Sequence, residues 1–339
     1  MKNKRILIIG GTGSLGQALI RRFKDNNELL IFSRDEAKQW TVRNHYPATP
    51  GLDFLVGSIR DVARLEEVIT RFVPQVIIIA AALKQVDTCE LSPFESIQTN
   101  IIGVKNVIDV VLRHHRFLSP MLETVLMVST DKACAPTNVY GMCKAISERL
   151  ITSASKSFTT PKFCVVRYGN VLESRGSIIP LFKYQAEHAE KFTLTHRDMT
   201  RYLMTLDESI DLIVKTIQDG SSGETWIPKL RSMRIMDLVD IFCKKYNKDY
   251  AIIGMRPGEK IHEDLISPPE SVRTIEKDGH YVVQPSHQPI QEHAPLFSYS
   301  SFDDTMSRDE LEDYLMTLGI FDKHLQDFQG KSIEEIRTN

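Results

Sequence analysis

The chain has 339 residues, of which 42% are hydrophobic and 25% are charged, and its formal net charge is −2. These values are typical of a globular protein with a sizeable core, and a charge so close to zero gives no indication of a nucleic-acid partner. The apolar run at 5–9 is too short for a signal peptide, and no run approaches the length of a membrane span. We therefore expect a cytoplasmic protein with no membrane partner.

The five cysteines give no sign of a disulfide framework or a zinc site. They are odd in number and lack paired C-x-x-C spacing, at positions Cys89, Cys134, Cys143, Cys164 and Cys243. We expect free, buried thiols and no metal site.

Short apolar runs alternate with longer amphipathic ones in the first half of the chain. Strands are predicted at 5–9, 28–32, 53–56, 76–80, 124–129 and 163–167, with a helix at 17–23 after the first of them. Strands that are apolar on both faces and joined by helices are typical of a parallel sheet covered on both sides. The predicted fold class is α/β, a doubly wound parallel sheet.

The pattern is looser after Asn170. A Gly/Ser/Arg loop precedes predicted helices at 180–188 and 206–218, and the composition shifts near Gly254. From Pro268 to about Tyr299, proline, histidine and serine are frequent, which predicts an extended or loop segment before an acidic helix at 308–318.

Glycines follow the first strand, where a phosphate-binding turn would lie. Backbone without a Cβ can approach a pyrophosphate closely, and the start of the next helix supplies N–H donors and partial positive charge. A turn without a ligand is the alternative, but the order of strand, turn and helix favours a dinucleotide. Contacts to it are predicted for Gly10, Thr12, Gly13, Ser14, Leu15 and Gly16.

The end of the second strand bears on the choice of dinucleotide. It reads Ser33-Arg34, where an acidic residue would hold the free 2′-hydroxyl of NAD. An arginine can instead bind a 2′-phosphate, so the sequence favours NADP over a merely solvated Arg34.

Two further loops, and Asn100 at the start of a predicted helix, are assigned to the same ligand. Ser58 and Ile59 follow the third strand, and small residues with a lysine follow the fourth, Ala80, Ala82 and Lys84. For Lys84 an ordinary surface position is the alternative, and Asn100 could simply cap a helix.

Two pairs of titratable residues follow the fifth strand. Tyr140 and Lys144 are four apart on a predicted helix, so they share one face, and the ammonium can favour the phenolate as a base. Asp131 and Lys132 add a second acid/base pair, whose alternative is an exposed ion pair. Adjacent residues of an extended segment point oppositely, so both reach one substrate only if the chain bends there.

These residues resemble the extended short-chain dehydrogenases/reductases and, more narrowly, the 5-inverting UDP-N-acetylglucosamine 4,6-dehydratases. The resemblance extends from Arg5 to about Ile266 and rests on the glycine turn, Asn100, the Tyr140/Lys144 pair and the segments 33–36, 81–86, 129–133, 166–171 and 255–260. One departure is Ser58, where the family usually has an aspartate. The resemblance implies an NADP-binding Rossmann domain at 1–170, joined by 200–228, and a substrate-binding part at 171–199 and 229–339.

The resemblance also implies a reaction on UDP-N-acetylglucosamine. Tyr140, assisted by Lys144, would take the proton of the carbon-4 hydroxyl as NADP⁺ accepts a hydride. Lys132, as a neutral amine, would then remove the carbon-5 proton. Positive charge on Lys144 and the oxidised nicotinamide would lower the pKa of Lys132, while a neighbouring carboxylate would raise it. Asp131, beside Thr130, would protonate the departing carbon-6 hydroxyl, and the hydride would return to carbon 6. A lysine beside this aspartate marks the inverting enzymes.

Substrate contacts are predicted downstream, beyond the carboxyl ends of the strands. Arginine pairs with phosphate oxygens and glutamate suits ribose hydroxyls. The candidates are Lys84, Asn170, Arg175, Ser177, Arg201, Arg256 and Glu259.

Two other functions remain open. A UDP-sugar 4-epimerase would use Tyr140 and Lys144 but has no need of Asp131 and Lys132. A non-catalytic, cofactor-binding scaffold commonly loses its tyrosine or lysine, and both are present here. We also expect a homo-oligomer.

Overall fold

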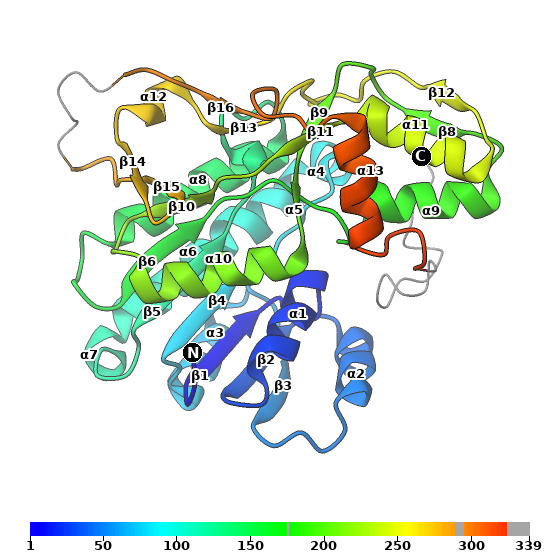
Figure 1. Cartoon of the computed structure of the whole chain (residues 1–339). Coiled ribbons are helices and arrows are strands. Elements are labelled where there is room, and N and C mark those ends of the chain that lie inside the picture. Colours follow the sequence, from blue (N-terminus) through cyan, green and yellow to red (C-terminus); the bar gives the residue numbers. More distant parts are fainter. Residues whose placement is uncertain (175, 289–294, 324–339) are drawn as a thin grey trace.

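A single large sheet organises the fold (Figure 1). The computed structural model describes residues 1–174, 176–288 and 295–323. Within them, seven parallel strands and an antiparallel hairpin form this sheet. Its order is β14 (Thr274–Lys277), β15 (His280–Val283), β10 (Thr225–Pro228), β6 (Lys162–Val166), β5 (Thr124–Val128), β4 (Val76–Ile79), β1 (Arg5–Ile9), β2 (Glu28–Ser33) and β3 (Leu52–Val56).

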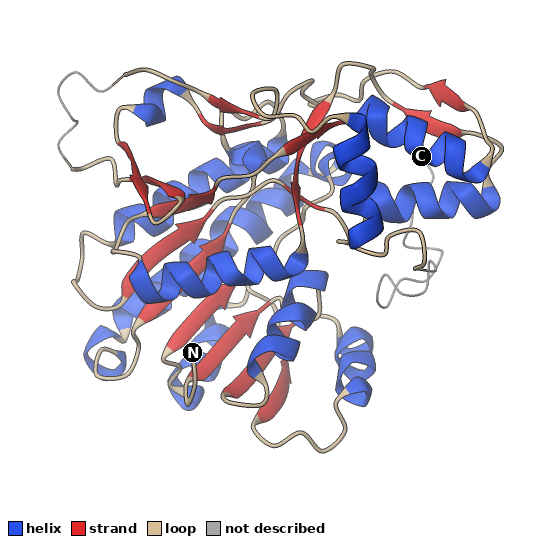
Figure 2. Ribbon diagram, viewed as in Figure 1, coloured by secondary structure: helices blue, strands red, loops and turns tan. Residues whose placement is uncertain are grey.

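Helices cover both faces of the sheet (Figure 2). Alternate residues of β1 enter two separate cores, with Leu7 and Ile9 on one face and Ile6 and Ile8 on the other. The first face packs against α3 (Val62–Phe72), α6 (Gly103–Arg113) and α8 (Val139–Ala154), and the second against α1 (Ser14–Phe23), α2 (Glu36–His45) and α10 (Leu206–Asp219). The predicted doubly wound α/β fold is confirmed.

Local capping signals fix where several of these helices begin. Asp35 and Asp61 accept backbone hydrogen bonds at the starts of α2 and α3, and Thr205 with Glu208 forms a capping box at α10. Between β4 and β5 lie α6 and the shorter α4 (Val86–Leu91), α5 (Pro93–Ser96), π-helix η1 (Ile97–Ile102) and α7 (His115–Leu118).

A second group of elements lies beyond the carboxyl ends of the parallel strands (Figure 1). Its core contains the mutually packed rings of Phe182, Phe192 and Phe242. It comprises α9 (Ile178–His188), α11 (Ile235–Tyr246) and α13 (Arg308–Thr317), with small sheets formed by β7 (Asn170–Val171), β9 (Thr200–Met204) and β11 (Ser232–Arg234), by β8 (Phe192–Leu194) and β12 (Tyr250–Ile252), and by β13 (Asp264–Ile266) and β16 (Tyr299–Ser300).

The segment after Pro268 differs from the sequence prediction. Instead of only loop, it forms α12 (Pro268–Ser271) and the β14–β15 hairpin, which pairs with β10 and so extends the large sheet. The hairpin turns at Asp278 and Gly279, both with positive φ, as expected for an Asp-Gly turn. The predicted acidic helix is confirmed as α13.

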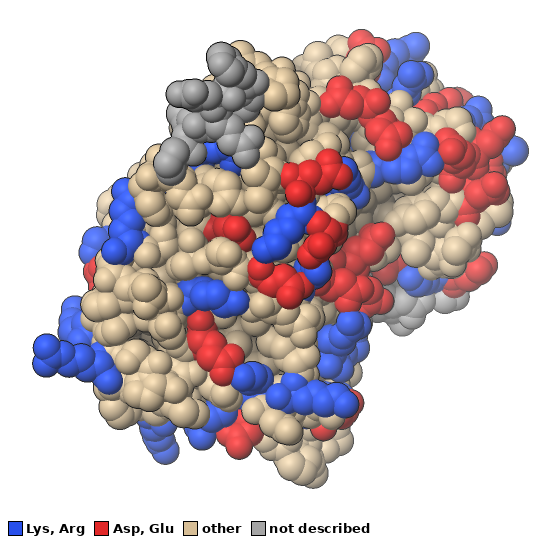
Figure 3. All heavy atoms as spheres, turned by 60° about the vertical axis from the view of Figure 1, so that its left-hand side comes forward, with Lys and Arg blue, Asp and Glu red and all other residues tan. Residues whose placement is uncertain are grey.

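Charged side chains of both signs are interspersed on the described face drawn in Figure 3. This distribution accompanies the formal net charge of −2. No helix in the described ranges is both long and apolar enough to cross a membrane.

Candidate active site

A cavity of about 610 Å³ opens at the carboxyl ends of β1, β4 and β5. From β1 the strand order runs through β2 to β3 in one direction and through β4 to β5 in the other. Ligands of doubly wound sheets bind at this reversal, because the loops on its two sides diverge and leave a crevice.

The glycine turn forms one wall of the cavity. Gly10 has φ +92°, and a Cβ there would lie 2.5 Å from the backbone nitrogen of Ala81, so the turn and the loop after β4 can meet only through glycine. Gly13 precedes α1, and no side chain caps this helix. The turn therefore leaves the helix N-terminus available to an anion and fits the pyrophosphate of a dinucleotide.

Positive charge gathers at the end of β2. Arg34 lines the cavity, and no hydrogen bond or ion pair engages it in the described chain. The Asp35 carboxylate is occupied as the cap of α2, where it accepts the Lys38 N–H at 2.9 Å. Lys38 also lines the cavity and was not predicted, although it lies in the first turn of the next helix. Two cationic side chains, Arg34 and Lys38, therefore lie at this end of β2, and the Lys38 ammonium is 3.5 Å from the Asp35 carboxylate.

Nearly all the other predicted cofactor residues reach the cavity. Those on its wall are Gly10, Thr12, Gly13, Ser14, Leu15, Gly16, Ser33, Ser58, Ile59, Ala80, Ala82 and Lys84.

Asn100, for which a cofactor contact was predicted, is not among the residues that line the cavity. Its buried Oδ1 accepts the Leu83 N–H and its Nδ2 donates to the Leu83 carbonyl, each at 2.9 Å. Asn100 therefore positions the loop after β4, while its neighbour Thr99 lines the cavity.

The chain bends directly after β5. Asp131–Ala133 form a 3₁₀ turn, η2, and Asp131 and Lys132 both line the cavity together with Thr130. The Thr130 hydroxyl donates to Asp131 Oδ1 at 2.7 Å. A Cβ on Gly141 would lie 2.1 Å from the Lys132 carbonyl oxygen, so this turn rests directly on the backbone of α8. The bend required for both side chains to reach one substrate is present.

Tyr140 and Lys144 are buried on α8 and line the same cavity. Burial lowers the pKa of Lys144 to about 8, although the Glu148 carboxylate opposes this shift. Burial, and then the charge of Asp131, raises the pKa of Tyr140, while a side-chain hydrogen bond with Thr130 opposes this shift. The Lys144 ammonium donates to the Val128 carbonyl, and stabilisation of the Tyr140 phenolate by Lys144 stays a prediction.

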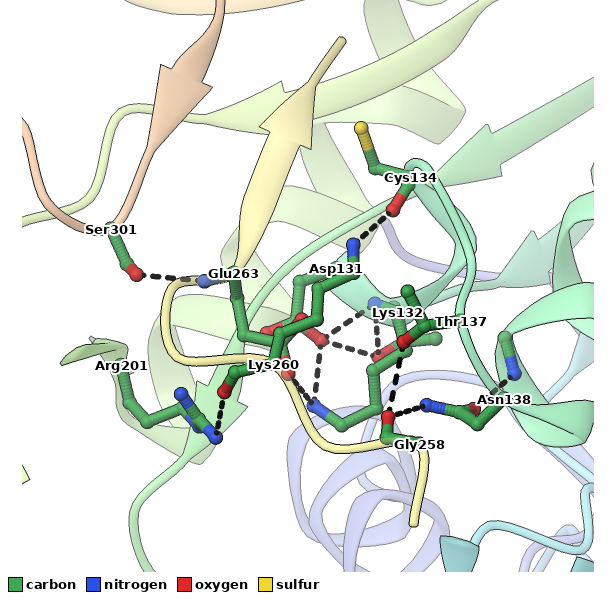
Figure 4. A network of polar contacts seen from close by, with 12 residues as sticks. Asp131, Lys132, Cys134, Thr137, Asn138, Arg201, Gly258, Lys260, Glu263 and Ser301 are labelled. Carbon is green, nitrogen blue, oxygen red and sulfur yellow. Dashed lines mark hydrogen bonds and ion pairs between the residues drawn. The ribbon is translucent and has the colours of Figure 1, made fainter. Parts of the chain in front are cut away.

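Lys132 lies between two carboxylates (Figure 4). Its Nζ is 3.2 Å from Asp131 Oδ1 and 3.1 Å from Glu263 Oε1. Burial alone would lower the pKa of Lys132, but Asp131 and Glu263 together outweigh burial and the opposing charge of Arg201, so the pKa is raised. The opposing pull of a neighbouring carboxylate was expected from Asp131, and Glu263 adds to it, while the lowering by the charge of the oxidised nicotinamide stays a prediction. Glu263 was not predicted, and its only signal was its position just after the 255–260 segment.

Hydrogen bonds between side chains and backbone fasten the segment containing Glu263 to the end of η2 and to the start of α8 (Figure 4). Asn138 Nδ2 donates to the Gly258 carbonyl at 2.9 Å, and Lys260 Nζ donates to the Cys134 carbonyl at 2.7 Å. These bonds place the segment 258–263, which is distant in sequence from η2, against the wall of the cavity.

A buried ion cluster lies behind the cavity and joins α8 to α12. The Arg167 guanidinium donates from Nε to Glu148 at 3.0 Å and from both terminal nitrogens to Glu270 at 2.9 Å. All three side chains are less than one-tenth exposed. Arg167 holds the pKa of Glu270 down to about 2, although burial opposes this shift.

The described substrate candidates all line the cavity, namely Lys84, Asn170, Ser177, Arg201, Arg256 and Glu259, whereas Arg175 lies outside the described residues. Arg201 is largely engaged in structure, because its guanidinium donates to the backbone carbonyls of Thr200, Ile261 and Lys260. The Arg256 guanidinium lies 3.5 Å from the Asp87 carboxylate, and the backbone N–H of Arg256 donates to the Glu259 carboxylate at 3.0 Å.

The fold and the paired tyrosine and lysine beside a dinucleotide cradle define an extended short-chain dehydrogenase/reductase. A family model described as polysaccharide biosynthesis protein matches residues 6–285. The chain belongs to this family.

Its relatives include both kinds of enzyme considered from the sequence. A Campylobacter jejuni protein named UDP-N-acetylglucosamine 4,6-dehydratase (inverting) is 37% identical, covering 84% of this chain and 83% of its own. A Rickettsia canadensis protein named UDP-glucose 4-epimerase is also 37% identical and covers 82% of each chain. The crystal structure of Pen from Bacillus thuringiensis superposes with a TM-score of 0.85 at 32% identity, covering 94% of this chain and 98% of Pen. The resemblance inferred from the motifs is confirmed.

Proposed function

We propose that the protein is an NADP-dependent hydro-lyase that removes water from UDP-N-acetylglucosamine, as a 4,6-dehydratase that inverts carbon 5. The observation that carries this proposal is the position of Asp131 and Lys132 in the same cavity as Tyr140 and Lys144. An enzyme that only moves a hydride needs Tyr140 and Lys144 alone. The Campylobacter relative, named for this reaction, supports the same assignment.

The residues present fit the cofactor and divide the proton transfers among themselves. The glycine turn would hold the pyrophosphate, and Arg34 with Lys38 the 2′-phosphate. When bound, NADP would supply reversible hydride transfer and a positive charge near the substrate. Tyr140 would take the carbon-4 hydroxyl proton, Lys132 the carbon-5 proton, and Asp131 would protonate the leaving oxygen of carbon 6.

The nucleotide half of the substrate has candidate partners along the rest of the cavity. Lys84 and Arg256 would pair with the diphosphate and Glu259 with ribose hydroxyls, while Asn170 and Ser177 supply further polar groups. Arg201 would contribute the N–H groups that do not already donate to backbone carbonyls of neighbouring residues.

Product analysis tests the proposal. The purified protein with NADP and UDP-N-acetylglucosamine should give a product lighter by one water, with one deuterium at carbon 5 when the reaction runs in D₂O. Proton NMR coupling constants would report the configuration at carbon 5. A Lys132→Ala variant should lose this activity but keep NADP affinity. Full dehydration by that variant would refute the role of Lys132.

UDP-sugar 4-epimerisation is the second candidate, because the Rickettsia relative of equal identity carries that name. It predicts a product of unchanged mass with a new configuration at carbon 4, and no need for Asp131. Conversion of UDP-glucose to UDP-galactose by an Asp131→Asn variant at the wild-type rate would establish it in place of dehydration. A protein that binds NADP and turns over neither sugar would be a scaffold.

We also propose a cytoplasmic homo-oligomer. All five cysteines are unpaired, as is usual in a reducing compartment. Apolar side chains exposed on neighbouring helices α4, α5 and α8 offer a surface for association, namely Leu91, Phe94, Met142 and Ile146.

A further inference from the structure

Glu263 is a buried carboxylate in the cavity that the proposed reaction has not yet used. Only 2% of the residue is exposed. Its Oε1 is 3.1 Å from Lys132 Nζ, while Oε2 is buried and has no hydrogen-bond partner in the described chain. A buried charge needs a partner, and the ammonium of Lys132 is the partner that the geometry provides.

The backbone of Glu263 is fixed from both sides. Its N–H donates to Ser301 Oγ at 2.9 Å, and its carbonyl accepts the Ser301 N–H at 2.8 Å (Figure 4). Ser301 is fully buried and its hydroxyl also hydrogen-bonds Thr200 Oγ1 at 2.6 Å. The Glu263 backbone is therefore fixed at the point from which its carboxylate reaches Lys132.

The proposed reaction makes contradictory demands on the resting pair. Lys132 must be a neutral amine and Asp131 must carry a proton, yet the structure places an ammonium against two carboxylates. One internal transfer satisfies both demands, namely transfer of a proton from Lys132 Nζ to Asp131 Oδ1. The two atoms are 3.2 Å apart and hydrogen-bonded, so no proton from solvent is needed. The net charge of Lys132, Asp131 and Glu263 taken together does not change.

We propose that Glu263 is a positioning residue, which stays ionised and holds Lys132 ready for this transfer. The inference rests on the proposed function. After the transfer, the amine lone pair takes the carbon-5 proton and the C–H electron pair forms the carbon-5 to carbon-6 double bond. The carbon–oxygen bond at carbon 6 breaks, and the oxygen leaves as water with the proton of Asp131. Lys132 is again an ammonium and Asp131 again a carboxylate.

Glu263 matters most at the moment when Asp131 is protonated. The described charged groups that act on Lys132 are Asp131, Glu263 and Arg201, and Arg201 opposes the ammonium. Once Asp131 is neutral, Glu263 alone among them favours the ammonium that forms when the carbon-5 proton is taken. Without Glu263, Lys132 is a weaker base at that step.

The first experiment titrates Lys132 without substrate. The full-length protein is carbamylated with cyanate over a range of pH, and peptide mass spectrometry gives the rate at Lys132, which reports the neutral amine. Glu263→Gln keeps the side-chain shape and should accelerate labelling of Lys132 about 10-fold or more at a pH where the amine is mostly protonated, since a neighbouring opposite charge shifts a pKa by one unit or more. Glu263→Asp should restore part of the wild-type titration.

The control is Glu276→Gln, which removes the carboxylate of a surface pair with Lys229 and should leave Lys132 unchanged. NADP affinity reports folding of every variant. If Glu263→Gln does not fold, the Glu263→Asp variant decides, because a shorter carboxylate should still move the titration. Coincident Lys132 titrations in wild type and the Glu263 variants would overturn the inference.

The second experiment separates this inference from the proposed function. In D₂O with NADP and UDP-N-acetylglucosamine, Glu263→Gln should lower kcat at least 10-fold and shift its pH profile, with KM little changed. If the wild type releases no water, the proposed function fails, but a shifted Lys132 titration still supports the role of Glu263. If the wild type and Glu263→Gln release water with identical pH profiles, the inference fails and the proposed function stands.

Discussion

The Arg167 cluster permits a quantitative prediction about stability. Replacing Glu270 by glutamine removes one buried carboxylate while Arg167 keeps its hydrogen bonds to Glu148. The folded-state pKa of Glu270 is lowered from 4.5 to about 2. At 1.36 kcal/mol per pKa unit, the ionised form stabilises the fold by roughly 3 kcal/mol.

The sign determines the pH range. The pKa of Glu270 is lowered on folding, so its stabilisation is complete above the unfolded pKa and is lost as the pH falls from about 4.5 to about 2. The free energy of unfolding of Glu270→Gln should therefore be roughly 3 kcal/mol lower than that of the wild type at pH 7. This difference should shrink by about 1.4 kcal/mol for each pH unit below about 4.5.

Urea unfolding followed by circular dichroism at several pH values between 3 and 7 measures this difference. Glu310→Gln is the matched control, because Arg231 and the Ser307 cap also hold the pKa of Glu310 down to about 2, but on the fully exposed surface. Solvent screening should make its effect on the midpoint small. A Glu270→Gln difference that is the same at pH 7 and pH 3 would refute the assignment of an ionised Glu270 to the cluster.

Three further predictions concern the site. Arg34→Glu should weaken binding of NADP about 10- to 100-fold but not binding of NAD, since hydrogen bonds to a charged group contribute about 1.5–3 kcal/mol. Fluorescence titration with each cofactor measures this, and equal losses of affinity for both would contradict the prediction. Because burial lowers the pKa of Lys144 to about 8, turnover that needs its ammonium should fall above about pH 8 in steady-state assays. Lys144→Arg should lack this fall, and an unchanged profile would remove Lys144 from the rate. Gly141→Ala would place a Cβ 2.1 Å from the Lys132 carbonyl, so turnover should fall on the order of 100-fold at unchanged NADP affinity; full turnover would mean that the turn does not depend on this contact.

The sequence predicted what depends on local pattern. The first six parallel strands are short apolar runs, and the glycine turn is a contiguous signal, so both could be located without coordinates, whereas β10 was not predicted. The hairpin after Pro268 also had a local signal at Asp278 and Gly279, but the surrounding proline and serine suggested a loop instead.

The sequence could not predict which residues from distant parts of the chain contact the side chains of the site. The pKa of Lys132 is raised because Glu263 joins Asp131 across a fold contact, and no spacing rule predicts that contact. Asn100 is similar, because its amide is consumed by Leu83 rather than by a ligand. Motif spacing identified the reactive groups, but the sign of their electrostatics depends on packing.

The contact between Gly141 and the Lys132 carbonyl has a consequence for regulation. The helix that carries Tyr140 and Lys144 into the cavity presents Met142 and Ile146 on its exposed side. A force applied to that outer side reaches the catalytic turn through backbone alone, with no flexible side chain to absorb it. If copies of the chain associate through this helix and thereby shift it, subunit association and acid/base geometry are thermodynamically linked, and substrate binding and assembly then alter each other's affinity by the same factor.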